Sequence, residues 1–275
     1  MAETPAAHEA VVDSLAEVWA SVADACRDLD DSQWALPTDC PGWSVQDQLS
    51  HLIGVERTLL GDPAPEPVNQ VPPYVKNAIG EMNEAWIEAR RQRPGSEVLA
   101  EFVDVTDRRL AALRGFPPEK FDEVGWSPIG QVPYRDFMGT RLLDSWTHEQ
   151  DIRRALDRPG GRNGAGETHI VTQCAGAMSF VVGKKVAPPD GTTVLFEVGG
   201  DLGRRVPVVV EGGRASVRPE LPSPPTVTLA MDQETFWRLG FGRVSPADVL
   251  ASGEASISGD AALGQQVLES MNFMI

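Results

Sequence analysis

The sequence has only three cysteines in 275 residues, and no two of them form a C-x-x-C pair. A set this small and scattered excludes the disulfide framework of small secreted domains. Cys26, Cys40 and Cys174 are therefore interpreted as small buried side chains, the usual environment of a free cysteine. Cys40 stands just before a predicted helix start, where a thiolate is favoured, so a reactive role stays open for this one.

Clusters of Lys and Arg, a basic N-terminus and long apolar runs are also absent. The chain has 40 acidic and 24 basic residues, a formal net charge of −16, and most of the acidic surplus precedes residue 191. This charge repels phosphate backbones and anionic membrane surfaces, which argues against nucleic-acid and membrane partners. The acidic start lacks the features of a secretion signal, and no apolar run is long enough to span a membrane. We expect a soluble, cytoplasmic protein.

Apolar residues recur every three or four positions in the first two thirds of the chain, which is the spacing of amphipathic helices. The helix at residues 45–60 has the clearest start. There Pro41-Gly42 form a turn, Ser44 can cap the helix, and Asp47 stands three residues later, as in a capping box. The other predicted helices cover residues 5–29, 74–91, 97–113, 134–156 and 167–186.

Downstream of residue 190 the pattern changes to β-branched or alternating segments between glycines. The segments "TTVLFEVGG", "RVPVVVEGG", "ASVRPE" and "SPPTVTLAMD" predict four strands of a short antiparallel sheet. Further helices are predicted around residues 233–239, 246–251 and 260–271. The sequence therefore predicts two domains that meet near Pro188: an all-helical domain over residues 1–188 and a small α+β domain over residues 189–275.

Three side chains of the helical half form a candidate metal site. Asp144 and His148 are four residues apart on one predicted helix, so they share a face and can chelate one ion. The same spacing also suits an ordinary hydrogen bond, and a lone helical His51 is usually a satisfied polar group. Together the three are more informative, because facing helices of a bundle can bring them to one interior point. Trp43 and Trp146 flank these residues, and packing is the usual role of such aromatic side chains.

Two further carboxylates lie one turn from the candidate ligands. Asp47 precedes His51 and could orient it, but the spacing from Ser44 favours a helix cap. Asp151 follows His148 and could orient it or transfer a proton, although a salt bridge to Arg153 or Arg154 is the simpler role. Asp151 is nevertheless the candidate catalytic residue, and it would act indirectly, through its contact with the candidate ligand His148.

Three stretches carry a resemblance to a known family: "LPTDCPGWSVQDQLSHLIGVE", "DSWTHEQDIRRAL" and, in the tail, "GRVSPADVLASGEASISGD". The chain resembles the DinB-like metalloprotein superfamily and, within it, the mycothiol-dependent maleylpyruvate isomerase group. The tail is similar to that group's sterol-carrier-like domain. The resemblance covers nearly the whole chain and implies a DinB-like four-helix-type bundle followed by a small sterol-carrier-like α+β domain.

The resemblance also implies a cofactor and a reaction. The group binds a metal, usually zinc, at positions that correspond to His51, Asp144 and His148. The open coordination position takes a low-molecular-weight thiol, mycothiol, which adds to a small electrophilic partner. The implied activity is a thiol-dependent isomerase of the maleylpyruvate type or a thiol S-transferase. The group has glutamate where this chain has Asp144, so either the helices lie closer together or metal binding is altered.

Two other classes of function remain open from the residues alone. Two histidines and one carboxylate also describe the site of non-haem iron oxygenases, which would make the chain an oxygen-dependent enzyme. That site normally lies on a β-barrel, whereas this half of the chain is predicted to be helical. The second alternative is a non-enzymatic protein with a structural metal and a tail that binds an apolar ligand.

Overall fold

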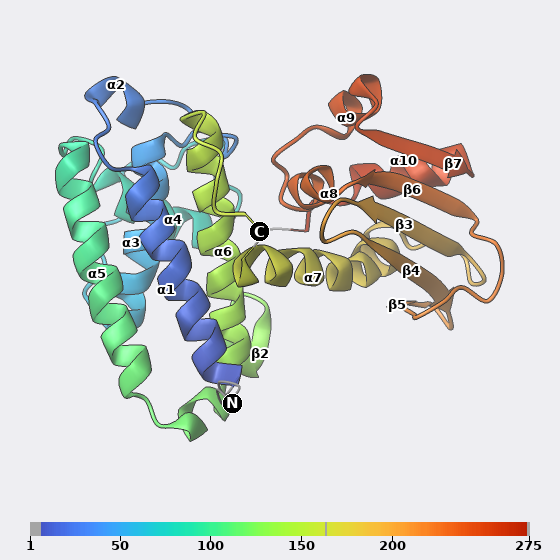
Figure 1. The fold of residues 1–275 in the computed structure, drawn as a ribbon, viewed down its shortest axis with the longest axis horizontal. Helices are drawn as coiled ribbons and strands as arrows, with labels where there is room; N and C mark the ends of the chain where they lie inside the picture. Colours follow the sequence, from blue (N-terminus) through green and yellow to red (C-terminus); the bar gives the residue numbers. More distant parts are fainter. Residues whose placement is uncertain (1–6, 163, 274–275) are drawn as a thin grey trace. The chain divides into compact units, whose positions relative to one another are not determined.

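The structure, a computed structural model, describes residues 7–162 and 164–273, so the predicted helix start at Pro5 lies outside the described residues. The described chain forms two compact units that divide after Gly166 (Figure 1). The first unit is mainly helical, and the second contains a five-stranded sheet.

The first unit is built on four long helices: α1 (Ala7–Ala25), α3 (Val45–Leu60), α5 (Gly95–Gly115) and α6 (Tyr134–Ala155). Helices α1 and α3 each contact both α5 and α6, so the four helices enclose one core. Fully buried side chains such as Leu15, Leu49, Phe102 and Trp146 fill that core. Shorter helices complete the unit: α2 (Asp31–Trp34), α4 (Ala78–Glu88) and the 3-10 helix η1 (Pro118–Asp122).

Helix α3 has the predicted bounds, and its first turn explains why. The Ser44 hydroxyl accepts from the Asp47 backbone N–H, and the Asp47 carboxylate accepts from the Ser44 N–H, which confirms the capping box. In the preceding turn Gly42 has a φ of +82°, and a Cβ there would lie 2.3 Å from the Tyr74 ring. Only glycine satisfies both conditions, so this turn fixes where α3 begins.

A hairpin that the sequence did not indicate precedes α6. Strands β1 (Val124–Ser127) and β2 (Gly130–Pro133) pair antiparallel in the segment between the helices predicted at residues 97–113 and 134–156. Each strand has only four residues set among Gly and Pro, which is too short to give a repeating strand pattern, and Val124 and Trp126 are exposed. The hairpin leads directly into α6, which carries two of the candidate ligands.

The second unit contains the helix α7 (Ala165–Phe180), a π-helical turn η2 (Val181–Val186) and an α+β domain. Its strands are β3 (Thr193–Gly199), β4 (Arg204–Glu211), β5 (Arg214–Val217), β6 (Val227–Asp232) and β7 (Ala255–Gly259). Its other helices are α8 (Gln233–Gly240), α9 (Pro246–Ser252) and α10 (Ala261–Glu269). Helices α8 and α10 contact the central strands.

The sheet corrects two expectations. Its order is β5-β4-β3-β6-β7, and the central strands β3 and β6 are parallel, whereas the sequence predicted an antiparallel sheet. Strands β4 and β5 extend the sheet on one side of β3. The chain then crosses over, and β6 pairs with the other side of β3 in the parallel direction. Strand β7 was also missed, since "ASISG" has few of the β-branched residues that indicate a strand.

The two compact units meet earlier in the chain than the predicted boundary near Pro188. Helix α7 belongs with the sheet because its side chains pack there: Gln233 of α8 donates to Glu167, and Arg204 of β4 donates to Thr172. Cys174 is fully buried close to Gly240. A helical period reveals a helix but does not show which neighbouring domain its apolar face covers.

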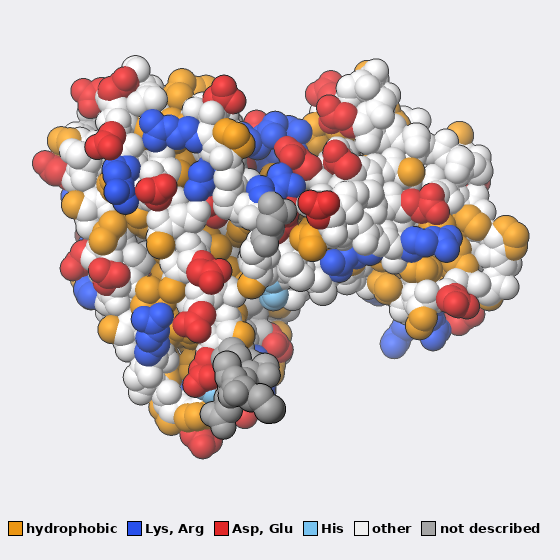
Figure 2. Space-filling view, viewed as in Figure 1, with side chains coloured by type: hydrophobic (Ala, Val, Ile, Leu, Met, Phe, Trp, Pro, Cys, Tyr) orange, Lys and Arg blue, Asp and Glu red, His pale blue; other side chains and the backbone are white. Residues whose placement is uncertain are grey.

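Charges of both signs are interspersed over the surface of the helical unit seen in Figure 2. Acidic side chains there stand among Lys and Arg rather than in one field of a single sign. Several charged side chains of this unit are paired: Glu101 contacts Arg57, Arg90 and Arg93, and Asp62 contacts Arg108. The excess of acid is therefore partly compensated locally.

Replacing Gly54 by alanine should destabilise the contact between α3 and α4. A Cβ at Gly54 would lie 2.4 Å from Cγ of Trp86, whose ring is held between the guanidinium groups of Arg57 and Arg90 at 5.4 and 5.3 Å. We expect Gly54→Ala to lower the free energy of unfolding by about 1–3 kcal/mol, measured by chemical denaturation. Gly115→Ala is the control, because its Cβ meets nothing within 4 Å. Equal effects of the two substitutions would contradict this packing argument.

Candidate metal centre

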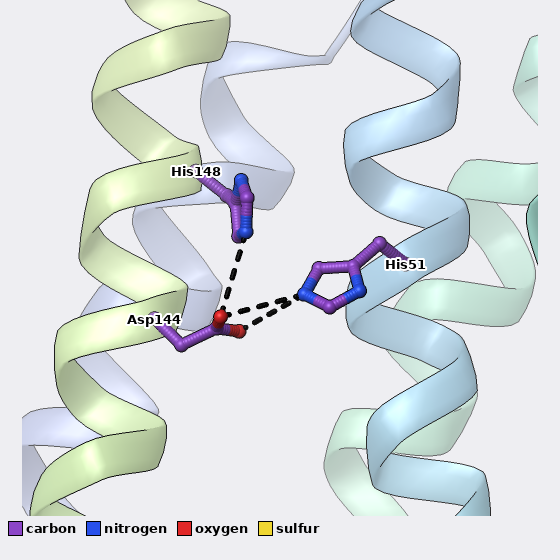
Figure 3. Close-up of side chains that lie close together, drawn as sticks. All are labelled: His51, Asp144 and His148. Carbon is purple, nitrogen blue, oxygen red and sulfur yellow. Dashed lines mark hydrogen bonds and ion pairs between the residues drawn. The ribbon is translucent and has the colours of Figure 1, made fainter. Parts of the chain in front are cut away.

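The side chains of His51, Asp144 and His148 converge between two helices (Figure 3). His51 lies on α3, seven residues after the N-cap Ser44 and so nearly two turns into the helix, and the other two residues lie four positions apart on α6. Because α3 packs against α6, these three predicted residues meet in the interior of the bundle.

The distances suit a single metal ion. The His51 Nε2 atom lies 3.2 and 3.4 Å from the two carboxylate oxygens of Asp144, and the His148 Nε2 atom lies 3.5 Å from Oδ1. One ligand atom from each residue falls within 4.8 Å of the others. Ligands bound tetrahedrally to zinc at about 2.0–2.2 Å lie roughly 3.4 Å apart, so the donor set and its spacing fit such an ion.

The three side chains also have suitable charge states for ligation. Burial lowers the pKa of His51 more than Asp144 raises it, so its imidazole is neutral near neutral pH. Burial would raise the pKa of Asp144, but Arg141 and the two histidines outweigh it and hold that pKa well below the usual range. Burial would lower the pKa of His148, but Asp144 and Asp151 raise it. A metal would therefore meet one neutral imidazole, one carboxylate and one imidazole that tends to hold its proton.

Asp151 lies behind His148, away from Asp144. Its carboxylate is fully buried, and Oδ2 stands 3.3 Å from the His148 Nδ1 atom. The two arginines after it have other contacts, since Arg153 donates to Glu149 and Arg154 donates to Asp39. The predicted position of Asp151 beside a candidate ligand is therefore present, with a carboxylate–imidazole contact of the kind that orients metal ligands.

Trp43 covers one side of the candidate site. Its ring centroid lies 5.0 Å from that of His51 and 5.7 Å from that of His148. The indole N–H donates to Glu84, a buried residue of α4, at 2.8 Å. The half-buried ring is thus held in place from α4 and shields both imidazoles, in line with the packing role favoured by the sequence.

A buried ion network that no sequence motif indicated reaches Asp144. Arg141 donates from Nη1 to Asp144 Oδ2 at 2.7 Å and from Nε to Glu56 Oε1 at 2.8 Å. Glu56 Oε2 accepts from Arg109 Nε at 3.1 Å, and Arg109 also donates to the Tyr134 hydroxyl. These residues come from α3, α5 and α6, so no sequence spacing reveals the whole set. The only local signal is that Arg141 precedes Asp144 by three positions on one helix face.

Cys26 and Cys174 do not supply a reactive thiol to this centre. Cys26 is fully buried, and burial raises its pKa to about 12. Burial likewise raises the pKa of Cys174, which lies in the second unit. Both confirm the expectation of small buried side chains. Cys40 is half-buried in the turn before α3.

Comparison with protein families identifies the bundle. Residues 15–153, half of the chain, match the model described as the mycothiol maleylpyruvate isomerase N-terminal domain. The chain belongs to this family. Residues 181–271 match the model of the SCP-2 sterol transfer family, which confirms the sterol-carrier-like tail. The resemblance that the sequence motifs indicated is thus confirmed for both parts.

Two curated proteins of Mycobacterium tuberculosis, from strains CDC 1551 / Oshkosh and ATCC 25618 / H37Rv, are similar to this member of the maleylpyruvate isomerase family. Each is named as an uncharacterized protein and is 27% identical to this chain over 127 residues. The match covers 45% of this chain and 48% of each relative. The chain therefore spans about half the length of the curated relatives it matches.

Solved structures confirm the fold class. The crystal structures of the mycothiol-dependent maleylpyruvate isomerase and of a mutant of it each match with a TM-score of 0.57 and 13% identity, over 93% of both chains. A helical bundle followed by a small α+β domain is therefore the fold of this family member. No helix in the described part of the chain combines the length and apolar character needed to cross a membrane.

Proposed function

We propose that this chain is a metal-dependent enzyme that activates a low-molecular-weight thiol, mycothiol, for addition to a small electrophile. The observation that carries the proposal is the convergence of two imidazoles and one carboxylate inside a bundle of the maleylpyruvate isomerase family. His51, Asp144 and His148 would hold the metal, for which zinc fits the donor set. Three protein ligands leave a position open, as in catalytic rather than structural zinc sites.

A bound divalent metal would stabilise the thiolate form of a thiol whose ordinary pKa is about 8.5. The residues of this chain prepare the centre for that role. His51 presents a neutral imidazole, and Asp144 presents a carboxylate kept ionised by Arg141. Asp151 orients His148, and Trp43 excludes water from one side of the two rings.

The thiolate sulfur would add to the double bond of an unsaturated carbonyl compound, and the electron pair would move to the carbonyl oxygen. Rotation about the resulting single bond, followed by elimination of the sulfur, would return the double bond in the trans geometry and regenerate the thiolate. In a transferase the adduct would instead take up a proton and leave, or, with a halogenated substrate, it would expel halide and leave as the substituted product. Both outcomes use the same residues and differ in the pocket around the electrophile.

Metal affinity should fall as the pH falls, because metal binding displaces a single proton from the site. The pKa of His148 is raised, so below that pKa a metal must displace its proton. His51 is already neutral because its pKa is lowered, and Asp144 is already ionised. We expect the apparent affinity to drop about tenfold per pH unit below the His148 pKa and to be level above it. Competition titration with a chromophoric chelator measures this slope, and a slope of two protons would contradict it.

The proposed function is tested by assaying purified protein with mycothiol before and after metal removal by a chelator. Maleylpyruvate serves as the isomerisation substrate, and a halogenated aromatic compound serves as the transfer substrate. Turnover of either that needs both mycothiol and metal supports the proposal. Oxygen consumption with bound iron would indicate the oxygenase alternative. Binding of a fatty acyl probe without consumption of any thiol would indicate the non-enzymatic alternative.

A further inference from the structure

Both oxygens of the Asp144 carboxylate lie near the His51 Nε2 atom, Oδ2 at 3.2 Å and Oδ1 at 3.4 Å, but their other partners differ. Oδ1 faces both imidazoles, at 3.4 Å from His51 and 3.5 Å from His148. Oδ2 accepts a charge-assisted hydrogen bond from Arg141 at 2.7 Å, the shortest of these contacts. A carboxylate held in this way offers one oxygen to a metal, while the other oxygen stays hydrogen-bonded to Arg141.

Arg141 is itself held in place. Its Nε donates to Glu56 at 2.8 Å, and Glu56 is anchored on its other oxygen by Arg109. The side chains of Arg141, Glu56 and Arg109 are all at least nine-tenths buried. The guanidinium therefore has little freedom to turn away from Asp144. The two arginines and the two acids also balance in formal charge, which reduces the cost of burying them together.

We propose that Arg141 is a positioning residue that makes Asp144 a one-oxygen ligand of the metal centre. The inference rests on the proposed function, because it takes His51, Asp144 and His148 as the ligands. It also accounts for the shorter carboxylate at this position: a fixed guanidinium on Oδ2 orients Oδ1 toward the two imidazoles without the extra methylene of glutamate.

The test compares Arg141→Met with Arg109→Met in the full chain. Both variants remove a buried guanidinium from Glu56, but only Arg141 contacts Asp144. Zinc affinity is measured by chelator competition, and the visible spectrum of the cobalt-substituted protein reports the coordination geometry. We expect Arg141→Met to weaken zinc binding about 10- to 100-fold and to change the cobalt spectrum. Arg109→Met should retain the wild-type spectrum and lose less affinity.

Arg141→Lys keeps a cation at the same place and should recover part of the zinc affinity. It also replaces Arg141→Met as the test variant if Arg141→Met fails to fold. Tighter zinc binding in Arg141→Met would contradict the inference, because it would mean that the guanidinium acts only as a repelling charge. Equal effects in Arg141→Met and Arg109→Met, or an unchanged cobalt spectrum in every folded Arg141 variant, would also overturn it. Failure of the metal centre itself is a separate result, seen as a wild-type chain that binds no zinc.

Discussion

Replacing His51 by alanine is expected to reduce bound zinc from about one ion per chain to none, while the protein stays folded. His51 supplies the only proposed ligand from α3, and the two residues left on α6 cannot complete a site of three. His148→Ala should have the same effect. Elemental analysis after dialysis gives the metal content, and circular dichroism shows whether each variant retains its helices.

His169→Ala is the matched control for these variants. His169 lies on α7 in the second unit and is not part of the cluster formed by the three candidate ligands. Its substitution should leave the metal content unchanged. Retention of zinc by a folded His51→Ala variant would contradict the proposed centre, whatever activity the protein has. Iron in the wild-type chain would keep the ligand set but change the chemistry.

Replacing Glu56 by leucine is expected to have the largest effect on stability. Glu56 is 1% exposed and accepts hydrogen bonds from both Arg109 and Arg141, which come from different helices. Its loss leaves two guanidinium charges buried without this partner, and breaking buried pairs of this kind costs about 3–5 kcal/mol of unfolding free energy. Urea denaturation followed by circular dichroism measures the loss.

Two further variants test the reason for that loss. Glu88→Gln removes an exposed partner of Arg91 at 3.1 Å and should change the stability by about 1 kcal/mol or less. The combined variant Glu56→Leu, Arg109→Met and Arg141→Met removes all three charges and should recover much of the stability lost by Glu56→Leu alone. A small effect of Glu56→Leu, similar to that of Glu88→Gln, would show that the network contributes little to the fold.

Local signals in the sequence predicted where the three candidate ligands lie on their helices. The helix that carries His51 is fixed by contacts within four residues, namely the Ser44–Asp47 capping box, and its bounds were predicted correctly. Asp144 and His148 share a face through a spacing that any α-helix imposes. What the sequence does not contain is the pairing of α3 with α6, which the family resemblance supplied.

The features that were missed depend on contacts between distant segments. The ion network joins Glu56 to Arg141 across 85 positions, and no periodicity encodes such a pair. The parallel pairing of β3 with β6 and the packing of α7 with the sheet likewise depend on which element covers which neighbour. The short hairpin β1–β2 was missed for a different reason: its four-residue strands, set among Gly and Pro, are too short to give a repeating pattern.

The candidate metal centre joins two helices whose ligands, His51 and Asp144, are 93 positions apart in the chain. An ion bound there acts as a removable cross-link of the bundle, and its binding free energy adds to that of folding. A metal present at 100 times its dissociation constant would stabilise the folded state by about 2.7 kcal/mol. If the proposed metal binds, the melting temperature of this protein would therefore depend on the free metal concentration around it, and its persistence under heat or proteolysis would follow the metal supply.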